Sequence, residues 1–491
     1  MAMSTPQAVE PTNHPLLFEI GSPGLCAVSL PESDVPAVER ASVVPAELLA
    51  DAPPDLPEVG ELDLVRHYKQ LSHRLFSIDG NFYPLGSCTM KYNPRINERV
   101  AFLPGFAQLH PYQDEADLQG ILELLYRLRC DLAEIAGLAE VTLQPAAGAH
   151  GEMTALMIIN AYHRSRGENR RKVLAPDSAH GTNPASCAIC GRESVSIRSA
   201  PDGRVDLDDL RAKVDEDTAA LMITNPNTVG VFDAQIAEIA RIVHAEGAQL
   251  YLDGANMNAI LGVTRPGDFG VDCMHYNTHK TFSTPHGGGG PGAGPVAVAE
   301  HLLEFLPVPQ VVRRNDGTYA WENDRPKSIG KVRSFFGQIG VLVRAYAYIR
   351  SLGCDGLRDV SEKAVLAANY VAARLKHRYP MPFPPPYAHE FITVPDFQDS
   401  GVTELDLAKR LIDYGIHPPT MSWPIAHCLM VEPTETESLA TLDRFVEVML
   451  KIADEVERDP DLVRHAPHTM PVRRLDEVSA NRKPNVCWRA P

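Results

Sequence analysis

The feature that most constrains the fold is an alternation of short apolar runs with helical patterns between residues 140 and 300. The apolar runs read EVTLQP, KVLAPD, VSIRSA, AALMITN, QLYLDG and CMHYN. Apolar residues at helical spacing lie between some of them, as in AQIAEIARIVHAEG, where Gly247 is suited to end the helix. Strands that alternate with helices form a mostly parallel sheet with helices on both faces. We therefore expect an α/β, doubly wound domain, which GPVAVAE (294–300) closes with an antiparallel strand.

The rest of the chain divides into parts that differ in composition and in the spacing of apolar residues. The start is rich in proline and weakly periodic, whereas LQGILELLYRLRCDLAEIA (118–136) predicts a helix that Gly137 ends. Helices and short strands interrupted by the connector YPMPFPPPY predict a small α+β domain near the C-terminus. The predicted parts are an N-terminal extended arm (1–60), a large domain (61–345), a small C-terminal domain (346–459) and a tail without an assigned fold (460–491).

Charge and composition exclude several classes of protein. The 491 residues carry a formal net charge of −17, which is unsuited to nucleic-acid binding. No run of 18 apolar residues predicts a membrane span, and the start lacks the pattern of a signal peptide. Of the nine cysteines, Cys187 and Cys190 form a CAIC pair, but no second pair completes a zinc site. We expect reduced thiols in a cytoplasmic protein without a metal.

Lys280 precedes the glycine run 287–290 in HYNTHKTFSTPHGGGGPGAGP, and its role is the central question. A phosphate-binding loop has its lysine after the glycines, so the order here is reversed. A dinucleotide fingerprint is also missing at the strand–helix junctions. The alternative is a lysine that reacts with a carbonyl group, and the glycines then let the backbone pass close to a cofactor or to a partner subunit.

A lysine that forms a Schiff base with pyridoxal phosphate needs three supports, and the sequence offers a candidate for each. Asp253, at the end of QLYLDG, offers a carboxylate that can keep the pyridine nitrogen protonated. His180 in PDSAHGTNPAS can stack on the ring, and Gly148 and Ala149 in QPAAGAHGE can form a phosphate cradle at a helix start. Each residue alone could equally be a turn or cap residue. All follow predicted strands, however, and ligands bind at the carboxyl ends of strands in open sheets.

These motifs belong to a larger set that carries a resemblance to a known family. The chain closely resembles the glycine cleavage system P-protein, glycine dehydrogenase (decarboxylating), and more specifically its β-type subunit 2. The matching stretches are PLGSCTMKYNPRIN, QPAAGAHGE, PDSAHGTNPAS, DGANMNA, RPGDFG, HKTFSTPHGGGGPG, HPPTMSWP and VEPTETES. The chain departs from the family at Tyr276 and Thr278, where mostly leucines are expected, and in its cysteine-rich CAIC stretch.

The resemblance implies a fold-type-I pyridoxal-phosphate enzyme with a large doubly wound domain and a small C-terminal domain. It implies that glycine is decarboxylated and that its aminomethyl group passes to the lipoyl arm of the carrier H-protein. A separate α subunit is also implied, in an α2β2 assembly. The implied catalytic residues are Lys280, His180 and Asp253. The implied cofactor contacts are Lys280 (covalent), Asp253 (pyridine nitrogen), His180 and Ala255 (ring faces), and Gly148 and Ala149 (phosphate). His279, beside Lys280, and Thr228, as a partner of the phenolic oxygen, are further candidate contacts.

Two further motifs leave alternatives open. In TNPNT, Asn225 or Thr228 could bond the cofactor, or the Asn-Pro pair could simply build a turn. In TMKYNPR, Lys91 or Arg95 could reach the glycine carboxylate or the lipoyl arm, or could form a loop salt bridge.

Three rival functions also remain at this point. One is another fold-type-I enzyme, such as an aminotransferase or a cysteine desulfurase. The second is a non-catalytic subunit that keeps the fold, and the third is a nucleotide-binding module. The intact set of candidate residues argues against the second rival, and the reversed order of lysine and glycines argues against the third.

Overall fold

The computed structural model describes residues 14–52, 54–287 and 290–487. They form two compact units, one of residues 81–466 and one made of the two chain ends, up to Gly80 and from Pro467. Each unit is described by itself. Two residues of the glycine run, 288 and 289, lie outside the described residues, as do residues 1–13 of the predicted arm.

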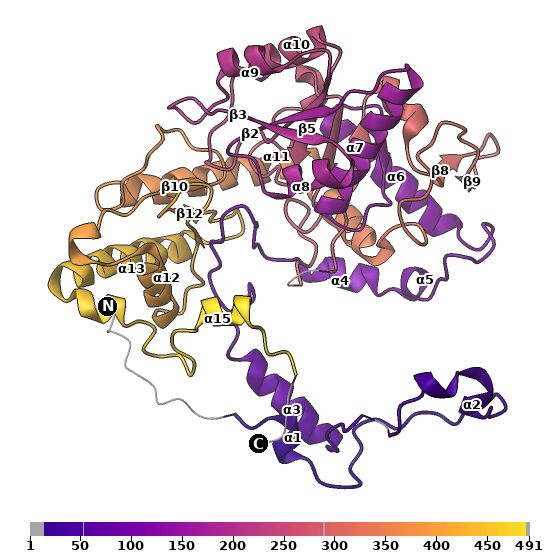
Figure 1. The fold of residues 1–491 in the computed structure, drawn as a ribbon, viewed down its shortest axis with the longest axis horizontal. Coiled ribbons are helices and arrows are strands. Elements are labelled where there is room, and N and C mark those ends of the chain that lie inside the picture. Colours follow the sequence, from indigo (N-terminus) through magenta and orange to yellow (C-terminus); the bar gives the residue numbers. More distant parts are fainter. Residues whose placement is uncertain (1–13, 53, 288–289, 488–491) are drawn as a thin grey trace. The chain divides into compact units, whose positions relative to one another are not determined.

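The larger unit contains a seven-stranded sheet of order β1-β7-β6-β5-β4-β2-β3 (Figure 1). The pairs from β3 through β6 are parallel, and β7 runs antiparallel to both of its neighbours. The predicted α/β class and the antiparallel strand are therefore confirmed. The strands are β1 (Glu140–Thr142), β2 (Lys172–Pro176), β3 (Glu193–Ile197), β4 (Thr218–Ile223), β5 (Gln249–Gly254), β6 (Cys273–Tyr276) and β7 (Val296–Val298).

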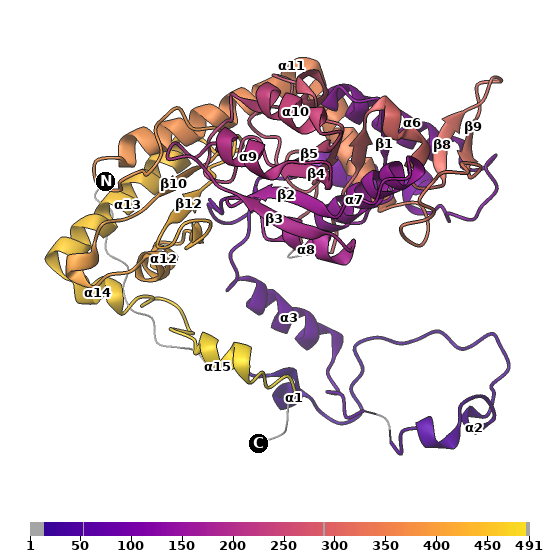
Figure 2. The same cartoon turned by 45° about the horizontal axis from the view of Figure 1, so that its top comes forward.

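Helices cover both faces of this sheet, because side chains of successive strand residues point to opposite faces. Leu250 and Leu252 of β5 belong to the hydrophobic cluster on one face, and Tyr251 belongs to the cluster on the other. Figure 2 shows the two helical layers with the strands between them. The first layer contains α6 (Gln119–Ala136), α9 (Leu207–Lys213), α10 (Ile236–Ala245) and α11 (Ile339–Leu375), and the second contains α7 (Gly148–Ser165), α8 (Thr182–Ile189) and η3 (Glu300–Phe305).

A second, three-stranded antiparallel sheet of order β10-β12-β11 lies in the C-terminal part of the same unit, as predicted for an α+β region. Its elements are β10 (Phe391–Thr393), α12 (Glu404–Asp413), β11 (Thr420–Met421), β12 (Leu429–Val431), α13 (Leu439–Arg458) and α14 (Pro460–Arg464). The unit also contains α4 (Arg95–Ala101), α5 (Pro104–Ala107), η2 (Pro266–Phe269), η4 (Gln398–Ser400) and the hairpin of β8 (Gln310–Arg313) and β9 (Tyr319–Glu322).

Helix α11 spans the predicted domain boundary at residue 345. The patterns VLVRAYAYIRSLG (341–353) and LAANYVAARLKHRY (366–379) predict two separate helices here, and the structure has a kink between them at Gly353, whose φ of 64° and ψ of −173° are not helical. This conformation is accessible to glycine and strained for other residues. The boundary at 345 stays a prediction.

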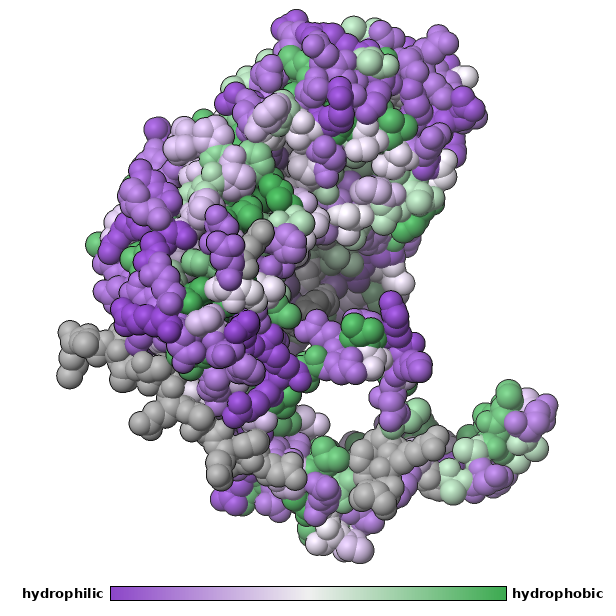
Figure 3. Space-filling view, turned by 60° about the vertical axis from the view of Figure 1, so that its left-hand side comes forward, coloured by the Kyte–Doolittle hydropathy of each residue, from purple (hydrophilic) through white to green (hydrophobic). Residues whose placement is uncertain are grey.

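The unit of the chain ends contains short helices and much irregular backbone. Its helices are α1 (Leu17–Ile20), α2 (Arg40–Val43), η1 (Ala46–Leu48), α3 (Glu61–Ser72) and α15 (Glu477–Arg482). Helix α15 and, in the larger unit, α14 form in the tail to which the sequence assigned no fold. Apolar side chains are exposed along this unit, among them Val28, Leu30 and Leu48 (Figure 3). Within the described ranges, no helix is long and apolar enough to cross a membrane.

Candidate active site

One cavity at the carboxyl ends of the central strands brings together the eight residues that the sequence assigned to catalysis or cofactor binding. These are Gly148, Ala149, His180, Thr228, Asp253, Ala255, His279 and Lys280. The cavity is further lined by Ser87, Glu152, Thr182, Thr224, Pro226, Asn256, Asn277, His389 and Glu390. The parallel strands explain this convergence, because β5 ends at Asp253 and Gly254 and β6 leads directly into the loop with Lys280.

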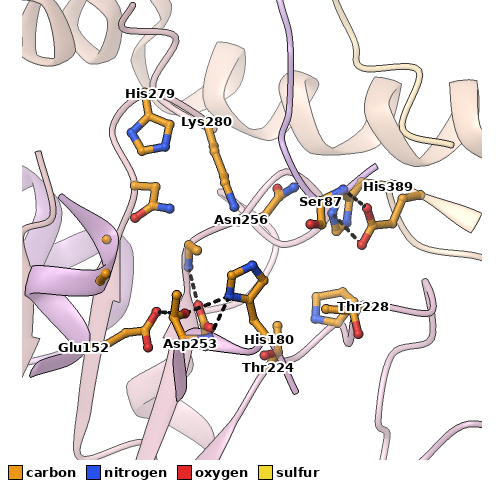
Figure 4. A pocket seen from close by; sticks show the side chains of 17 residues that line it. Ser87, Glu152, His180, Thr224, Thr228, Asp253, Asn256, His279, Lys280 and His389 are labelled. Carbon is orange, nitrogen blue, oxygen red and sulfur yellow. Dashed lines mark hydrogen bonds and ion pairs between the residues drawn. The ribbon is translucent and has the colours of Figure 1, made fainter. Parts of the chain in front are cut away.

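Lys280 extends into the space between Asp253 and His180 on one side and Ser87 and His389 on the other (Figure 4). Its backbone is fixed, since its N–H donates to the Asn277 carbonyl at 3.0 Å. Among the residues that the structure describes, its ammonium group has neither a hydrogen-bond nor an ion-pair partner. Such a lysine is placed to react rather than to hold a fold together.

Asp253 is buried, with 4% of its surface exposed. Its Oδ1 accepts a hydrogen bond from the Ala255 N–H at 3.1 Å and lies 3.7 Å from Nε2 of His275. A buried carboxylate with few donors is well suited to pair with a cationic ring nitrogen, because desolvated charges are stable only with partners.

The start of helix α7 forms a cradle of small residues. A Cβ at Gly148 would overlap Asn277 Oδ1, and a Cβ at Gly294 would overlap the Ala147 carbonyl oxygen, so both positions need glycine. Gly148 and Ala149 line the cavity, and the first N–H groups of a helix have no partner within it. The cradle therefore fits a phosphate group.

Several polar atoms at this cavity are buried and have no partner among the described residues. They include Thr224 Oγ1, Asn277 Oδ1 and His279 Nδ1. Buried polar groups are normally hydrogen-bonded. The residues present thus fit a polar, anionic ring compound such as pyridoxal phosphate.

The structure decides whether Asn225 of the TNPNT loop builds a turn or faces the cofactor. Asn225 exchanges hydrogen bonds with the backbone of Asp233, at 2.9 and 3.2 Å, so its amide builds the turn. Thr228 lines the cavity, but its hydroxyl donates to the Ser178 carbonyl at 2.5 Å. Thr224, four residues earlier in the chain, keeps its hydroxyl free among the described residues and was missed by the sequence analysis.

Glu152, in the second turn of α7, is another residue that the sequence analysis did not single out. It is 3% exposed and accepts hydrogen bonds from the hydroxyls of Thr182 at 2.6 Å and Ser186 at 3.3 Å. Thr182 in turn lies 2.7 Å from Nδ1 of His180, so this chain orients the histidine ring. Burial and the nearby Asp253 raise the pKa of Glu152 to about 8.

The opposite wall contains two buried glutamates that differ in their hydrogen bonds. Glu432 accepts hydrogen bonds from the backbone and hydroxyl of Thr89 and from the amides of Asn256 and Asn258. Glu390 accepts from the Ser87 N–H at 2.7 Å, and burial beside Glu432 raises its pKa well above the usual range. Burial therefore favours the neutral form of Glu390.

The histidines next to the lysine are neutral. Burial and the Lys280 charge lower the pKa of His279 to about 3, and burial also lowers the pKa of His180. His180 is exposed to the cavity, which leaves a ring face open for stacking.

Lys91 does not reach the cavity. It forms a salt bridge, as the second alternative predicted, and this salt bridge is buried. Its Nζ donates to Glu435 at 2.6 Å and to the Thr281 carbonyl at 2.8 Å, and the side chain is completely buried. Lys91 therefore anchors the segment next to Lys280.

Known proteins resemble this chain along most of its length. Residues 37–317 match the family described as "Glycine cleavage system P-protein", and residues 360–468 match "Glycine dehydrogenase, C-terminal domain". A protein of Bacillus licheniformis described as "Probable glycine dehydrogenase (decarboxylating) subunit 2" is 55% identical over 473 residues, which are 96% of this chain and 97% of that protein.

Solved structures share the fold. An inhibitor-bound glycine decarboxylase (P-protein) of the glycine cleavage system superposes with a TM-score of 0.71 at 22% identity, over 84% of this chain and 94% of that chain. A cysteine desulfurase from Thermococcus onnurineus gives a TM-score of 0.61 at 17% identity, over 77% and 95%. The fold alone thus accommodates different reactions.

Proposed function

The chain belongs to the family of the glycine cleavage system P-protein, and from this premise we propose how its residues carry out the reaction. It is an enzyme that decarboxylates glycine in the glycine cleavage system, with pyridoxal phosphate as its cofactor. Subunit 2 relatives align along nearly their full length, which separates this chain from fold-type-I enzymes that share only the fold.

Lys280 is the residue that binds the cofactor covalently. The observation that carries this proposal is its ammonium group, which extends into the cavity opposite Asp253 and has no partner among the described residues. Asp253 holds a proton on the pyridine nitrogen. When bound, pyridoxal phosphate supplies the electron sink that makes loss of carbon dioxide from glycine possible.

The remaining cavity residues hold and orient the cofactor. His180 and Ala255 cover the two ring faces, and Gly148 and Ala149 bind the phosphate. Thr228 was predicted to bond the phenolic oxygen, and Thr224 fits that role better because its hydroxyl is not already donated. His279 stays neutral next to Lys280, so its imidazole serves as a hydrogen-bonding group for the cofactor rather than as a base.

The product leaves by transfer to a carrier protein. The bond from the α-carbon of glycine to its carboxylate breaks, carbon dioxide departs, and the α-carbon bonds to one sulfur of the lipoyl disulfide of the H-protein. The other sulfur takes one proton and becomes a thiol, so the disulfide is reduced as the carbon is oxidised. We assign a separate α-type subunit as the partner of this chain, in an α2β2 assembly.

Exchange of labelled bicarbonate into the carboxyl group of glycine tests the proposal. The chain would be combined with its α partner and the lipoyl carrier, and Lys280→Ala compared with Lys327→Ala, an exposed lysine that pairs with Glu304. We expect Lys280→Ala to lower exchange to the level without enzyme and Lys327→Ala to keep it. Substantial exchange by Lys280→Ala would overturn the assignment.

A further inference from the structure

We propose that Tyr251 and His275 form a buried relay, made of one hydrogen bond and one longer electrostatic contact, that holds Asp253 ionised and oriented toward the pyridine nitrogen of the cofactor. Both are positioning residues, because they act on the cofactor only through Asp253. The inference rests on the proposed role of Asp253 and adds two buried side chains of the sheet that support this role.

The relay is built by two adjacent parallel strands. Tyr251 lies on β5 two residues before Asp253, and His275 lies on β6, where it pairs in register with Asp253. The Tyr251 hydroxyl is 2.5 Å from His275 Nδ1. His275 Nε2 has no hydrogen-bond partner among the described residues and lies 3.7 Å from Asp253 Oδ1, beyond hydrogen-bond distance, so it acts on that carboxylate electrostatically. The two rings are nearly parallel, at 7°, and both side chains have no exposed surface.

The available donors and acceptors determine which atom of Tyr251 and His275 donates in the relay. Burial raises the pKa of Tyr251 and lowers that of His275, so the phenol keeps its proton and the imidazole is neutral. A neutral imidazole has one donor and one acceptor nitrogen. If the phenol donates to Nδ1, the ring proton lies on Nε2 and faces the Asp253 carboxylate. In the other tautomer the phenol proton has no acceptor among the described residues, and a lone pair faces the carboxylate.

The relay matters because Asp253 is not the only carboxyl group nearby. Glu152 shares the same end of the cavity, and two close carboxyl groups disfavour double ionisation. A donor directed at Asp253 keeps the charge there, where it can pair with the ring nitrogen, and leaves the proton on Glu152. Without the relay, Asp253 would compete with the ring nitrogen for a proton.

The test compares the affinities of the cofactor-free chain for pyridoxal phosphate and for its 1-deaza analogue, in which carbon replaces the ring nitrogen. The wild-type preference for pyridoxal phosphate reports the contact of Asp253 with that nitrogen. We expect Tyr251→Phe to reduce this preference about tenfold by weakening binding of pyridoxal phosphate, with less than about a twofold change for the analogue.

Tyr276→Phe is the matched control. Its hydroxyl is equally buried, follows His275 on the same strand, and donates to the Leu132 carbonyl at 2.6 Å, away from Asp253. We expect it to leave the preference unchanged. If Tyr251→Phe weakened both compounds equally, or changed neither, the relay would be wrong.

The histidine provides a second test should Tyr251→Phe fail to fold. His275→Gln keeps a donor near the position of Nε2 and should retain most of the preference, whereas His275→Leu should lose it. Equal preferences in these two variants would overturn the proposal. A wild-type chain that binds pyridoxal phosphate without any preference would refute the role of Asp253 itself, and the relay with it. A wild-type preference that Tyr251→Phe retains would refute the relay alone.

Discussion

At the scale of single residues, the cavity depends on which carboxyl groups carry a proton. Asp253 and Glu152 lie at the same end of it, and only Asp253 has a histidine nitrogen facing it. Glu152 instead receives two hydroxyl donors and has a pKa raised from 4.5 to about 8 by burial and by Asp253. A neutral acid and an ionised acid can therefore lie side by side, each in its own hydrogen-bond environment.

The raised pKa of Glu152 predicts a pH dependence of stability. Between pH 4.5 and 8 the unfolded chain releases this proton and the folded chain keeps it, so the free energy of unfolding falls as the pH rises. Glu152→Gln removes this titration. We expect its free energy of unfolding to fall less than that of the wild type between pH 5 and 8, by on the order of a few kcal/mol.

Urea unfolding of the cofactor-free chain at several pH values in this window measures the effect. Glu134→Gln changes an exposed glutamate and should follow the wild type. Parallel curves for wild type and Glu152→Gln would show that Glu152 is ionised in the folded chain.

Sequence reasoning reached Lys280, Asp253 and Gly148 because each follows a recognisable strand, and parallel strands bring their ends to one place. It missed Glu152 and Thr224, because their roles depend on contacts with residues from other elements. Lys91 shows the limit most clearly, since its ion-pair partner Glu435 lies 344 positions away in the chain. Spacing along the sequence carries no signal for such a contact.

At the scale of elements, the strands and long helices were predictable from apolar periodicity. The division of α11 into two helical segments was predictable as well, because Gly353 ends the first helical pattern and has non-helical φ and ψ in the structure. The short strands β8, β9 and β11 were missed.

One buried ion cluster joins two helices of the C-terminal region and allows a prediction at this scale. Arg410 of α12 has no exposed surface and contacts Asp413 at 3.0 Å and both carboxylate oxygens of Glu455 in α13, at 2.8 and 3.0 Å. Arg410→Ala would leave two carboxylates buried without their cation. We expect the free energy of unfolding to fall by about 3–5 kcal/mol.

Denaturant unfolding at neutral pH measures this loss. Arg458→Ala removes an arginine that is 80% exposed and lies 3.7 Å from Asp454, and it should change stability by less than about 1 kcal/mol. Similar losses in the two variants would contradict the structural role of the buried cluster.

At the scale of the whole molecule, the unit of the chain ends differs from the unit that holds the cavity. Residues 14–60 expose many apolar side chains, including Val35, Val38 and Leu56, and bury very few. Exposed apolar surface of this kind is typical of a segment that contacts another protein. The proposed α-type subunit is the partner that the family implies.

Limited proteolysis tests whether residues 14–60 contact the α-type subunit. We expect the isolated chain to be cleaved first within residues 14–60, because the backbone there makes few internal contacts. Addition of the α-type subunit should slow this cleavage several-fold, whereas the same amount of an unrelated acidic protein should not. Equal cleavage rates with and without the partner would place the subunit contact elsewhere.

The measurement that tests the central claim most directly is a visible absorption spectrum of the chain with pyridoxal phosphate, followed by borohydride reduction and peptide mass mapping. We predict a yellow absorption band that reduction abolishes, with the pyridoxyl mass on the peptide that contains Lys280. A stable pyridoxyl group on another lysine, with Lys280 unmodified, would contradict the assignment of this site.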